Sequence, residues 1–188
     1  MNKAIFLDRD GVINVEKNFV LSPEEMELIK EAPHAISLIN KSDYLAVLVT
    51  NQSAVARNLI TLKELSMIHN KLKADLKKGG ASLNAIYFCP HHPNYDPSKG
   101  NPELIRECTC RKPKPGMLYA AAEDLNIDLK QSFLIGDSER DILAAKAAGC
   151  KTVGVRTGKN IDNFSVVPDH VFENILEATQ FILSKDKD

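Results

Sequence analysis

The sequence predicts an α/β fold: a three-layer, doubly wound parallel sheet with helices on both faces. Short apolar runs typical of buried strands alternate along the chain with amphipathic segments typical of helices. Polar or acidic residues directly follow several of these runs, and sites on such sheets gather beyond the carboxyl ends of the strands. The chain has 188 residues, so we expect a single domain over 1–188.

Apolar runs locate the strands and capping residues locate the helices. The predicted strands cover residues 4–7, 44–49, 84–89, 132–135 and 151–155. Residues 22–25 indicate a helix start, with a capping box that begins at Ser22 and a proline at the first helical position. Thr61 and Glu64 form a second capping box. The predicted helices cover residues 33–41, 61–78, 115–125, 140–148 and about 173–183, before a charged tail at 185–188 that we expect to be frayed.

The composition excludes several classes of function. A net charge of −1 provides no basic surface for nucleic acid or for an anionic membrane. Asp8, Arg9 and Asp10 interrupt the early apolar run, so no signal peptide is predicted, and no apolar stretch approaches the roughly 20 residues of a membrane span. We expect a cytoplasmic, monomeric enzyme with no nucleic-acid or membrane partner.

Polar groups converge at one edge of the predicted sheet. Asp8 and Asp10 follow the first strand two residues apart, so their carboxylates point the same way and repel unless a cation or proton lies between them. Taken alone, this segment also suits a turn that ends a strand, with Gly11 favouring the turn. The second strand ends at Thr50 and the fourth at Asp137. The convergence of three acids and a hydroxyl favours a functional site over a turn.

The chemistry of this edge points to phosphoryl transfer. Carboxylates with little nearby positive charge suit a hard divalent cation, and Mg²⁺ is expected. A carboxylate can also attack phosphorus and form an aspartyl-phosphate. Thr50 and Lys112 would then neutralise the phosphoryl oxygens.

Four motifs in order resemble those of the haloacid-dehalogenase-like phosphatases. They are Asp8-Arg9-Asp10-Gly11, Val49-Thr50-Asn51-Gln52-Ser53, Arg111-Lys112-Pro113, and Gly136-Asp137 with Asp141. The resemblance covers roughly residues 1–160. It implies that Asp8 is the nucleophile and Asp10 the general acid and base, with Thr50 and Lys112 binding the transferring phosphoryl group. It also implies that Asp8, the backbone carbonyl of Asp10, and Asp137 hold Mg²⁺. Asp141 is expected next to these ligands without binding the ion directly.

A second constellation predicts a structural zinc site. Cys89 and His91 precede a long loop at about 89–114, and Cys108 and Cys110 lie near its end. Three cysteines and one histidine in two close pairs match a closed tetrahedral zinc site. The zinc would join the two ends of this loop and fix its conformation. His91 is preferred to its neighbour His92. The alternatives are unrelated reduced thiols, or a Cys108–Cys110 disulfide that would be strained at so short a spacing.

Within the family, these zinc-loop residues and Val155-Arg156-Thr157-Gly158-Lys159 resemble the D-glycero-D-manno-heptose 1,7-bisphosphate phosphatases. These members lack a large cap domain and are related to the histidinol-phosphate phosphatases. The resemblance implies removal of the 7-phosphate during synthesis of nucleotide-activated heptoses for lipopolysaccharide. The residues it places against the substrate are Glu16, Lys17, Asn18, Phe19, Asn51, Gln52, Ser53 and Arg111. Glu16 and Lys17 could equally be solvated loop charges.

The chain departs from this pattern at several positions. Ala54 and Asn58 replace usual glycines, and Phe19 stands where tyrosine is common. Ser138 stands where members often carry a lysine near the phosphate. None of these changes touches the catalytic positions, but they leave the identity of the substrate undecided. The alternatives are a histidinol-phosphate phosphatase, a nucleic-acid 3′-phosphatase, and a zinc-bearing binding module without catalysis.

Overall fold

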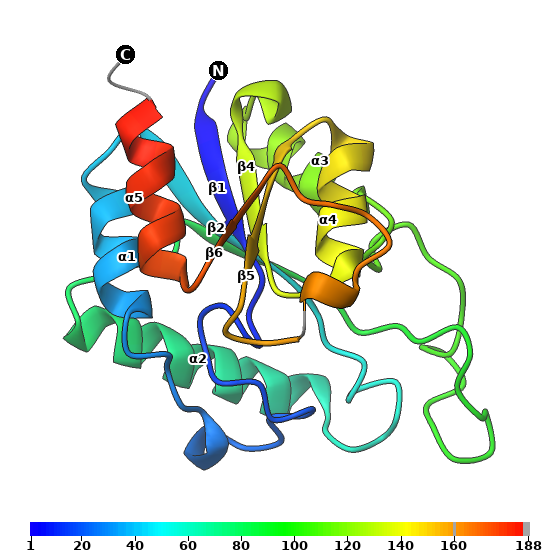
Figure 1. Ribbon diagram of the computed structural model, residues 1–188. Coiled ribbons are helices and arrows are strands. Elements are labelled where there is room, and N and C mark those ends of the chain that lie inside the picture. Colours follow the sequence, from blue (N-terminus) through cyan, green and yellow to red (C-terminus); the bar gives the residue numbers. More distant parts are fainter. Residues whose placement is uncertain (160, 186–188) are drawn as a thin grey trace.

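The computed structural model describes residues 1–159 and 161–185. Six parallel strands form one sheet in the order β3-β2-β1-β4-β5-β6 (Figure 1). The strands are β1 (Lys3–Leu7), β2 (Tyr44–Asn51), β3 (Ala85–Cys89), β4 (Phe133–Gly136), β5 (Lys151–Val155) and β6 (His170–Phe172). The predicted α/β parallel sheet is confirmed. The sequence does not predict β6, because this edge strand has only three residues, two of them exposed, and lacks an apolar run.

The five α-helices of the described residues begin and end within about two residues of the predicted bounds. They are α1 (Ala32–Asn40), α2 (Leu62–Lys78), α3 (Gly116–Leu125), α4 (Glu139–Ala148) and α5 (Ile175–Lys185). The capping box of Thr61 and Glu64 forms as predicted. The helix start at 22–25 is wrong: Pro23–Glu25 makes a single 3-10 turn, Ser22 gives no side-chain cap, and Met26 is already extended. Of the predicted tail, residues 186–188 lie outside the described residues.

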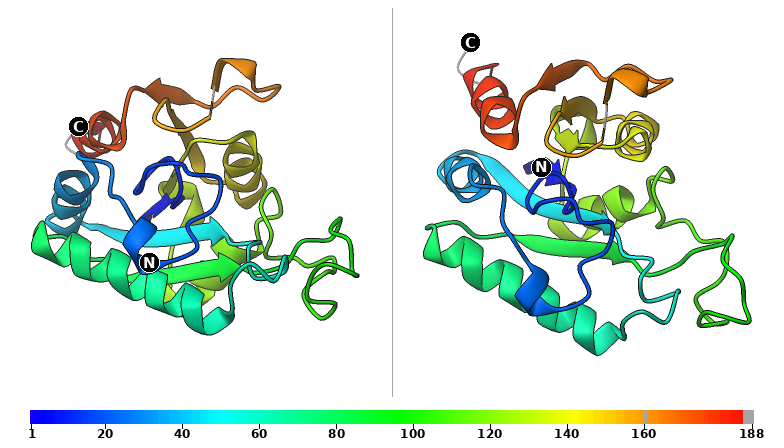
Figure 2. Two further views of the ribbon diagram at one scale, coloured as in Figure 1. Left: turned by 90° about the horizontal axis from the view of Figure 1, so that it is seen from below. Right: turned by 60° about the horizontal axis from the view of Figure 1, so that its bottom comes forward.

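The helices cover the sheet in two layers, as the views in Figures 1 and 2 show. Side chains alternate along β1, so Ile5 and Leu7 pack in the core beneath α1, α2 and α5, whereas Ala4 and Phe6 pack beneath α3 and α4. All four are fully buried. Each large apolar side chain buried in this way contributes about 1.5–3 kcal/mol relative to exposure.

The strand order places a topological switch point between β1 and β4. The chain runs outward from β1 through β2 to β3, then returns across the sheet through α3 to place β4 beside β1. Directly after β1, the Asp8 amide donates to the carbonyl of Ile135 in β4 at 3.1 Å and extends the pairing of the two strands. Ligands of open α/β sheets bind at such a point. The long segment between β3 and α3, green in Figure 1, leaves the sheet at the same edge.

The helices of the described residues include none with the length and apolar character needed to cross a membrane.

Candidate active site

A cavity of about 250 Å³ opens at the switch point. Asp8 enters it from the end of β1, Thr50 from β2, Asp137 from the end of β4, and Lys112 from the segment before α3. Asp10 lines the cavity as well, so the four predicted catalytic positions and the predicted Mg²⁺ ligand Asp137 meet in one place, although they are spread over most of the chain. Thr50, Lys112 and Asp137 are each at most 2% exposed.

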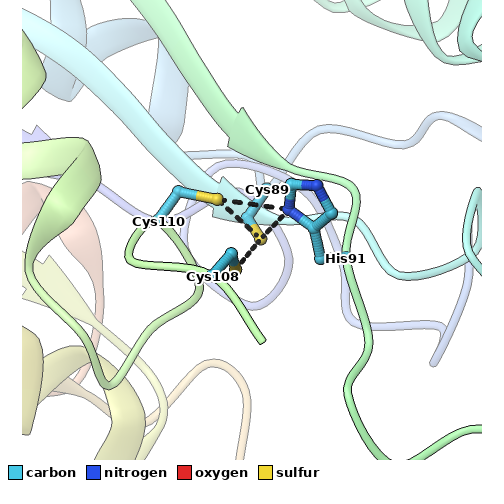
Figure 3. Close-up of side chains that lie close together, drawn as sticks. All are labelled: Cys89, His91, Cys108 and Cys110. Atoms are coloured by element: carbon cyan, nitrogen blue, oxygen red, sulfur yellow. Dashed lines mark hydrogen bonds between the residues drawn. The ribbon is translucent and has the colours of Figure 1, made fainter. Parts of the chain in front are cut away.

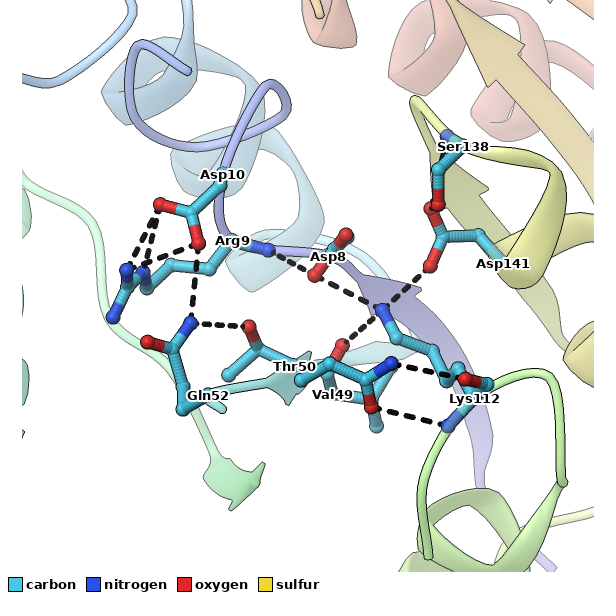
Figure 4. Close-up of polar contacts among 10 residues, drawn as sticks. Asp8, Arg9, Asp10, Val49, Thr50, Gln52, Lys112, Ser138 and Asp141 are labelled. Carbon is cyan, nitrogen blue, oxygen red and sulfur yellow. Dashed lines mark hydrogen bonds and ion pairs between the residues drawn. The ribbon is translucent and has the colours of Figure 1, made fainter. Parts of the chain in front are cut away.

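Lys112 stands at the centre of the polar contacts in this cavity (Figure 4). Its Nζ lies 2.9 Å from Asp8 Oδ1 and 2.5 Å from Asp141 Oδ1, and donates to the carbonyl of Val49 at 2.8 Å. The ammonium thus uses its three N–H groups on two carboxylates and a backbone oxygen. The two carboxylates outweigh the cost of burial and raise the pKa of Lys112, so the lysine is charged.

Two residues at the end of β2 bind Lys112 and Asp10 through their side-chain amides. The side-chain amide of Asn51 donates to the carbonyl of Lys112 and accepts from its N–H, each at 3.0 Å. Gln52 Nε2 donates to Thr50 Oγ1 at 2.9 Å and to Asp10 Oδ2 at 3.1 Å. Asn51 and Gln52 are therefore bound within the site and fix the positions of its catalytic candidates.

Asp10 is held by a buried arginine, Arg9, to which its place in the sequence assigned no role. Arg9, only 1% exposed, donates from Nη2 to both carboxylate oxygens of Asp10, at 2.9 and 3.0 Å. Asn14 Nδ2 donates to Asp10 Oδ1 at 2.9 Å. Burial alone would raise the pKa of Asp10, but Arg9 and these hydrogen bonds outweigh it and lower the pKa. Asp10 is an anion before substrate binds.

The other carboxylates repel one another. Burial, followed by the charge of Asp141, raises the pKa of Asp8 to about 6, and burial followed by Asp8 raises that of Asp137 to about 8. Ligand oxygens of Asp8, Asp137 and Asp141 all lie within 4.8 Å of one another. Crowded acids with raised pKa values are what a divalent cation stabilises, so the site fits Mg²⁺.

The loops around Asp137 leave room for its carboxylate only because glycines line them. A Cβ at Gly158 would lie 2.0 Å from Asp137 Oδ2, and one at Gly11 would lie 2.4 Å from it. Gly11 also has a φ of +78°, in the left-handed region that favours glycine. The Lys159 amide donates to the same oxygen at 3.1 Å. Both glycines are therefore part of the architecture of this acid.

Asp141 differs from Asp8 and Asp137 because both of its carboxylate oxygens have a partner. Oδ1 pairs with Lys112, and Oδ2 accepts from the amide and hydroxyl of Ser138 at 3.0 and 2.6 Å. These contacts form the capping box at the start of α4. Ser138 therefore turns toward the helix and uses its hydroxyl to hold Asp141.

The raised pKa values predict how pH affects the metal-free fold. Above the ordinary carboxyl pKa of 3.8 the unfolded chain releases its protons, while folded Asp8 and Asp137 keep theirs up to about pH 6 and 8. The folded state binds more protons, so these groups make stability fall as pH rises from about 4 to 8. Mg²⁺ should therefore raise the melting temperature more at pH 8.5 than at pH 5.5. Differential scanning calorimetry with and without added Mg²⁺ measures this, and an equal shift at both pH values would contradict it.

The predicted zinc ligands gather in the structure (Figure 3). Cys89 Sγ lies 3.6 Å from Cys108 Sγ and 3.2 Å from Cys110 Sγ, and His91 Nδ1 lies 3.4 Å from Cys110 Sγ. A tetrahedron of sulfur ligands with Zn–S bonds of about 2.3 Å has edges near 3.8 Å, close to these separations. Hydrogen bonding to Cys89, ahead of that to His91, lowers the pKa of Cys110 to about 5, so a thiolate is available to bind metal.

The residues predicted to contact substrate divide into two groups. Seven of them line the cavity: Glu16, Asn18, Phe19, Asn51, Gln52, Ser53 and Arg111. Lys17 does not line it, because its ammonium pairs with Glu27 at 2.8 Å and donates to the carbonyl of Glu25.

The cavity is also lined by residues to which the sequence assigned no contact with substrate: Arg9, Arg57, His92, Arg140 and Lys159. Ser138 lines it too, in keeping with the place near the phosphate that the family's pattern gives this position. Arg9 lies inside the first motif, and that position is the one signal that would have found it. His92 was considered only as the less favoured zinc ligand; its ring instead contacts Arg57, with Nε2 2.9 Å from Arg57 Nη2. These residues come together through loop folding, which no short-range spacing reveals.

Known proteins resemble this chain over nearly its whole length. The HAD-hydrolase-like family model matches residues 109–178. The D-glycero-beta-D-manno-heptose-1,7-bisphosphate 7-phosphatase of Pasteurella multocida is 39% identical over 97% of each chain, and that of Vibrio cholerae 37% over 98% of each. The crystal structure of D,D-heptose 1,7-bisphosphate phosphatase from B. bronchiseptica, complexed with magnesium and phosphate, matches with a TM-score of 0.86 at 35% identity, covering 97% of this chain and 99% of that one. The chain therefore belongs to the D-glycero-D-manno-heptose-1,7-bisphosphate 7-phosphatase family of the haloacid-dehalogenase-like hydrolases.

Proposed function

We propose that this chain hydrolyses the 7-phosphate of D-glycero-D-manno-heptose 1,7-bisphosphate through an aspartyl-phosphate, a step toward nucleotide-activated heptose. One observation carries the proposal: Asp8 lies in a cavity beside Lys112 and Asp137, in a chain whose nearly full-length relatives are named for this activity. The sugar-phosphate substrate follows from the same relatives.

Asp8 is the proposed nucleophile. In the described part of the chain, its carboxylate contacts all involve Oδ1, which accepts from the Arg9 amide at 2.7 Å and pairs with Lys112. Oδ2 is therefore the atom that attacks phosphorus. The Oδ2–P bond forms as the bond from phosphorus to the sugar oxygen O7 breaks. Water then attacks the same phosphorus, which releases inorganic phosphate and restores Asp8.

Asp10 moves the protons of both steps. It gives a proton to the leaving O7, and later takes one from the attacking water. The lowered pKa of Asp10 means that it must gain a proton with the substrate, and the negative charge of an incoming phosphate favours this because it disfavours a second anion nearby. Gln52 and Arg9 keep the carboxylate in place through the cycle.

Asp8, the backbone carbonyl of Asp10, and Asp137 would hold Mg²⁺. When bound, the ion screens the charge of the attacking carboxylate from that of the phosphate. Asp141 stays behind these ligands, because Lys112 and Ser138 already occupy its oxygens. Thr50 and Lys112 bind the transferring phosphoryl group, with Lys112 exchanging one of its carboxylate contacts for a phosphoryl oxygen.

Substrate comparison tests the function. The chain should release phosphate from heptose 1,7-bisphosphate with a kcat/KM at least about tenfold above that for histidinol phosphate, since a site built for one set of polar groups rejects a substrate that lacks them. Phosphorus NMR of the product should show only the 1-phosphate remaining. A 3′-phosphorylated DNA oligonucleotide, assayed at physiological salt, should not react. A tenfold preference for histidinol phosphate would overturn the proposal, and comparing α- and β-anomers defines the substrate further.

We also propose that Cys89, His91, Cys108 and Cys110 bind structural zinc. The clustering of their ligand atoms within 4.8 Å supports this. The segment between β3 and α3 contains no helix or strand. A bound metal would fix its conformation in place of the packing that helices and strands receive from the core.

Cys110→Ser should lose the metal. Elemental analysis of the wild-type protein should give about one equivalent of zinc, and the variant should hold little and melt at a lower temperature. Cys150→Ser is the matched control, because Cys150 is buried but lies outside the four-residue cluster. Less than about half an equivalent of zinc in the wild-type protein would count against the site.

A further inference from the structure

The charges around the cavity are segregated. Asp8, Asp137 and Asp141 cluster with Lys112 at the strand ends, where the phosphoryl chemistry is proposed. Three arginines that are not needed for that chemistry also line the cavity, and we call them the outer basic cluster: Arg57, Arg111 and Arg140. Among the described residues, no ion pair joins any of these guanidinium groups to a carboxylate. Among the described residues, the cluster is thus a set of cations without a carboxylate partner.

Arg57 is held in a fixed position at the cavity. Its Nη2 lies 2.9 Å from His92 Nε2, and its guanidinium stacks against the rings of Tyr95 at 4.7 Å and Phe19 at 5.5 Å. Three loops that are distant in sequence are joined by these contacts. The Nε atom of Arg57 is buried and has no hydrogen-bond partner. Because Nε is closed off from solvent, a ligand in the cavity would bind the terminal Nη groups of this guanidinium instead.

Arg111 and Arg140 face the same space from two other elements. Arg111 Nη1 donates to the His91 carbonyl at 2.9 Å, so the predicted zinc loop sets its position. Arg140 is exposed and lies in the first turn of α4, where the positive end of the helix dipole disfavours a cation. The two are close enough to interact: burial, and then the charge of Arg140, lower the pKa of the Arg111 guanidinium. Such crowding costs free energy in the absence of an anion.

We propose that Arg57 and Arg140 bind, together with Arg111, the phosphate of the substrate that is not hydrolysed. This rests on the proposed function, because a heptose 1,7-bisphosphate carries one phosphate to Asp8 and a second one outside the reacting centre. Guanidinium groups suit the role, since their planar N–H pairs bind phosphate oxygens bidentately. Arg57 supplies the terminal Nη groups of a guanidinium that lines the cavity, and Arg140 supplies a side chain with no other described partner. Both residues thereby select a bisphosphate over a monophosphate.

Paired kinetics test this assignment. Arg57→Gln and Arg140→Gln should each lower kcat/KM for heptose 1,7-bisphosphate by about tenfold or more, mainly through KM, because each removes a hydrogen bond to a charged group. Hydrolysis of p-nitrophenyl phosphate should change less than about twofold, because this substrate has no second phosphate for the arginines to bind. Arg156→Gln is the matched control: its guanidinium pairs with Asp162 and Glu173 and does not line the cavity.

The possible outcomes distinguish a failure of the outer basic cluster assignment from a failure of the proposed function. Equal losses on both substrates, or unchanged kinetics on the bisphosphate, would overturn the role of the cluster. If the wild-type enzyme prefers the bisphosphate to heptose 7-phosphate and both variants keep that preference, the proposed function stands and the cluster assignment falls. If the wild-type enzyme shows no such preference, both fall. Because Arg140 is exposed, Arg140→Gln provides a folded test even if Arg57→Gln, which joins three loops, does not fold.

Discussion

Asp8→Asn should abolish turnover while leaving the protein folded. Removing the nucleophile of a covalent mechanism costs at least about 10⁴-fold in kcat. The fold should tolerate the change, because burial and the charge of Asp141 already disfavour the ionised form of Asp8. At pH 8 without Mg²⁺, the melting temperature should equal or exceed that of the wild-type protein. Steady-state kinetics with the bisphosphate and scanning calorimetry measure the two effects.

A trapping experiment distinguishes a lost nucleophile from a distorted site. Wild-type enzyme quenched in acid during turnover should carry one added phosphoryl group by mass spectrometry, located on Asp8 by peptide mapping, and the Asp8→Asn variant should carry none. Retention of a tenth or more of the wild-type rate by this variant would rule out the covalent mechanism.

Lys112→Met should damage stability and catalysis together. The lysine is 2% exposed and is the ion-pair partner of both Asp8 and Asp141. Removing one member of a buried ion network leaves uncompensated charge and lowers the free energy of unfolding by about 3–5 kcal/mol. Loss of the phosphoryl contact should also lower kcat by about 10²-fold or more. Chemical denaturation at pH 8 and kinetics with the bisphosphate check both results.

The loss of stability should depend on pH in a defined direction. Lys112 lowers the pKa of Asp8, so its removal leaves a carboxylate that protonates more readily. The loss should therefore be smaller at pH 5 than at pH 8. Lys114→Met is the matched control, since Lys114 lies two residues after Lys112, its side chain is half exposed, and its ion-pair partner among the described residues is Glu107. If the Lys112→Met protein were as stable as this control at pH 8, the ion pairs of Lys112 with Asp8 and Asp141 would not stabilise the fold.

Much of the fold was predictable because its signals are local. β1 and β2 are apolar runs that only burial stabilises, and their ends are marked by the polar residues that follow. The capping box of Thr61 and Glu64 depends on groups three residues apart, so the start of α2 could be located closely. The 22–25 segment shows the limit of such signals: its proline and acids favour a helix start, but the chain leaves the helical conformation after one turn.

The catalytic candidates were predictable for a related reason. Asp8, Thr50 and Asp137 each follow or end a strand, and parallel strands bring their carboxyl ends to one edge. Lys112 and the zinc-ligand candidates were found by motif and spacing, and the structure gathers them as expected.

By itself the sequence determined which residues form β1 to β5, which edge carries the acids, and which cysteines and histidine gather. Only the tertiary structure decided the partners within the site. The contacts of Asn51 with Lys112, Gln52 with Asp10, and Arg57 with His92 span 61, 42 and 35 residues. The same holds for the binding of Asp10 by a buried arginine, the role of Ser138 as a cap, and the outer basic cluster. Strand and helix signals repeat every two to four residues, whereas these contacts depend on how loops from separate strands pack against one another, which no local periodicity encodes.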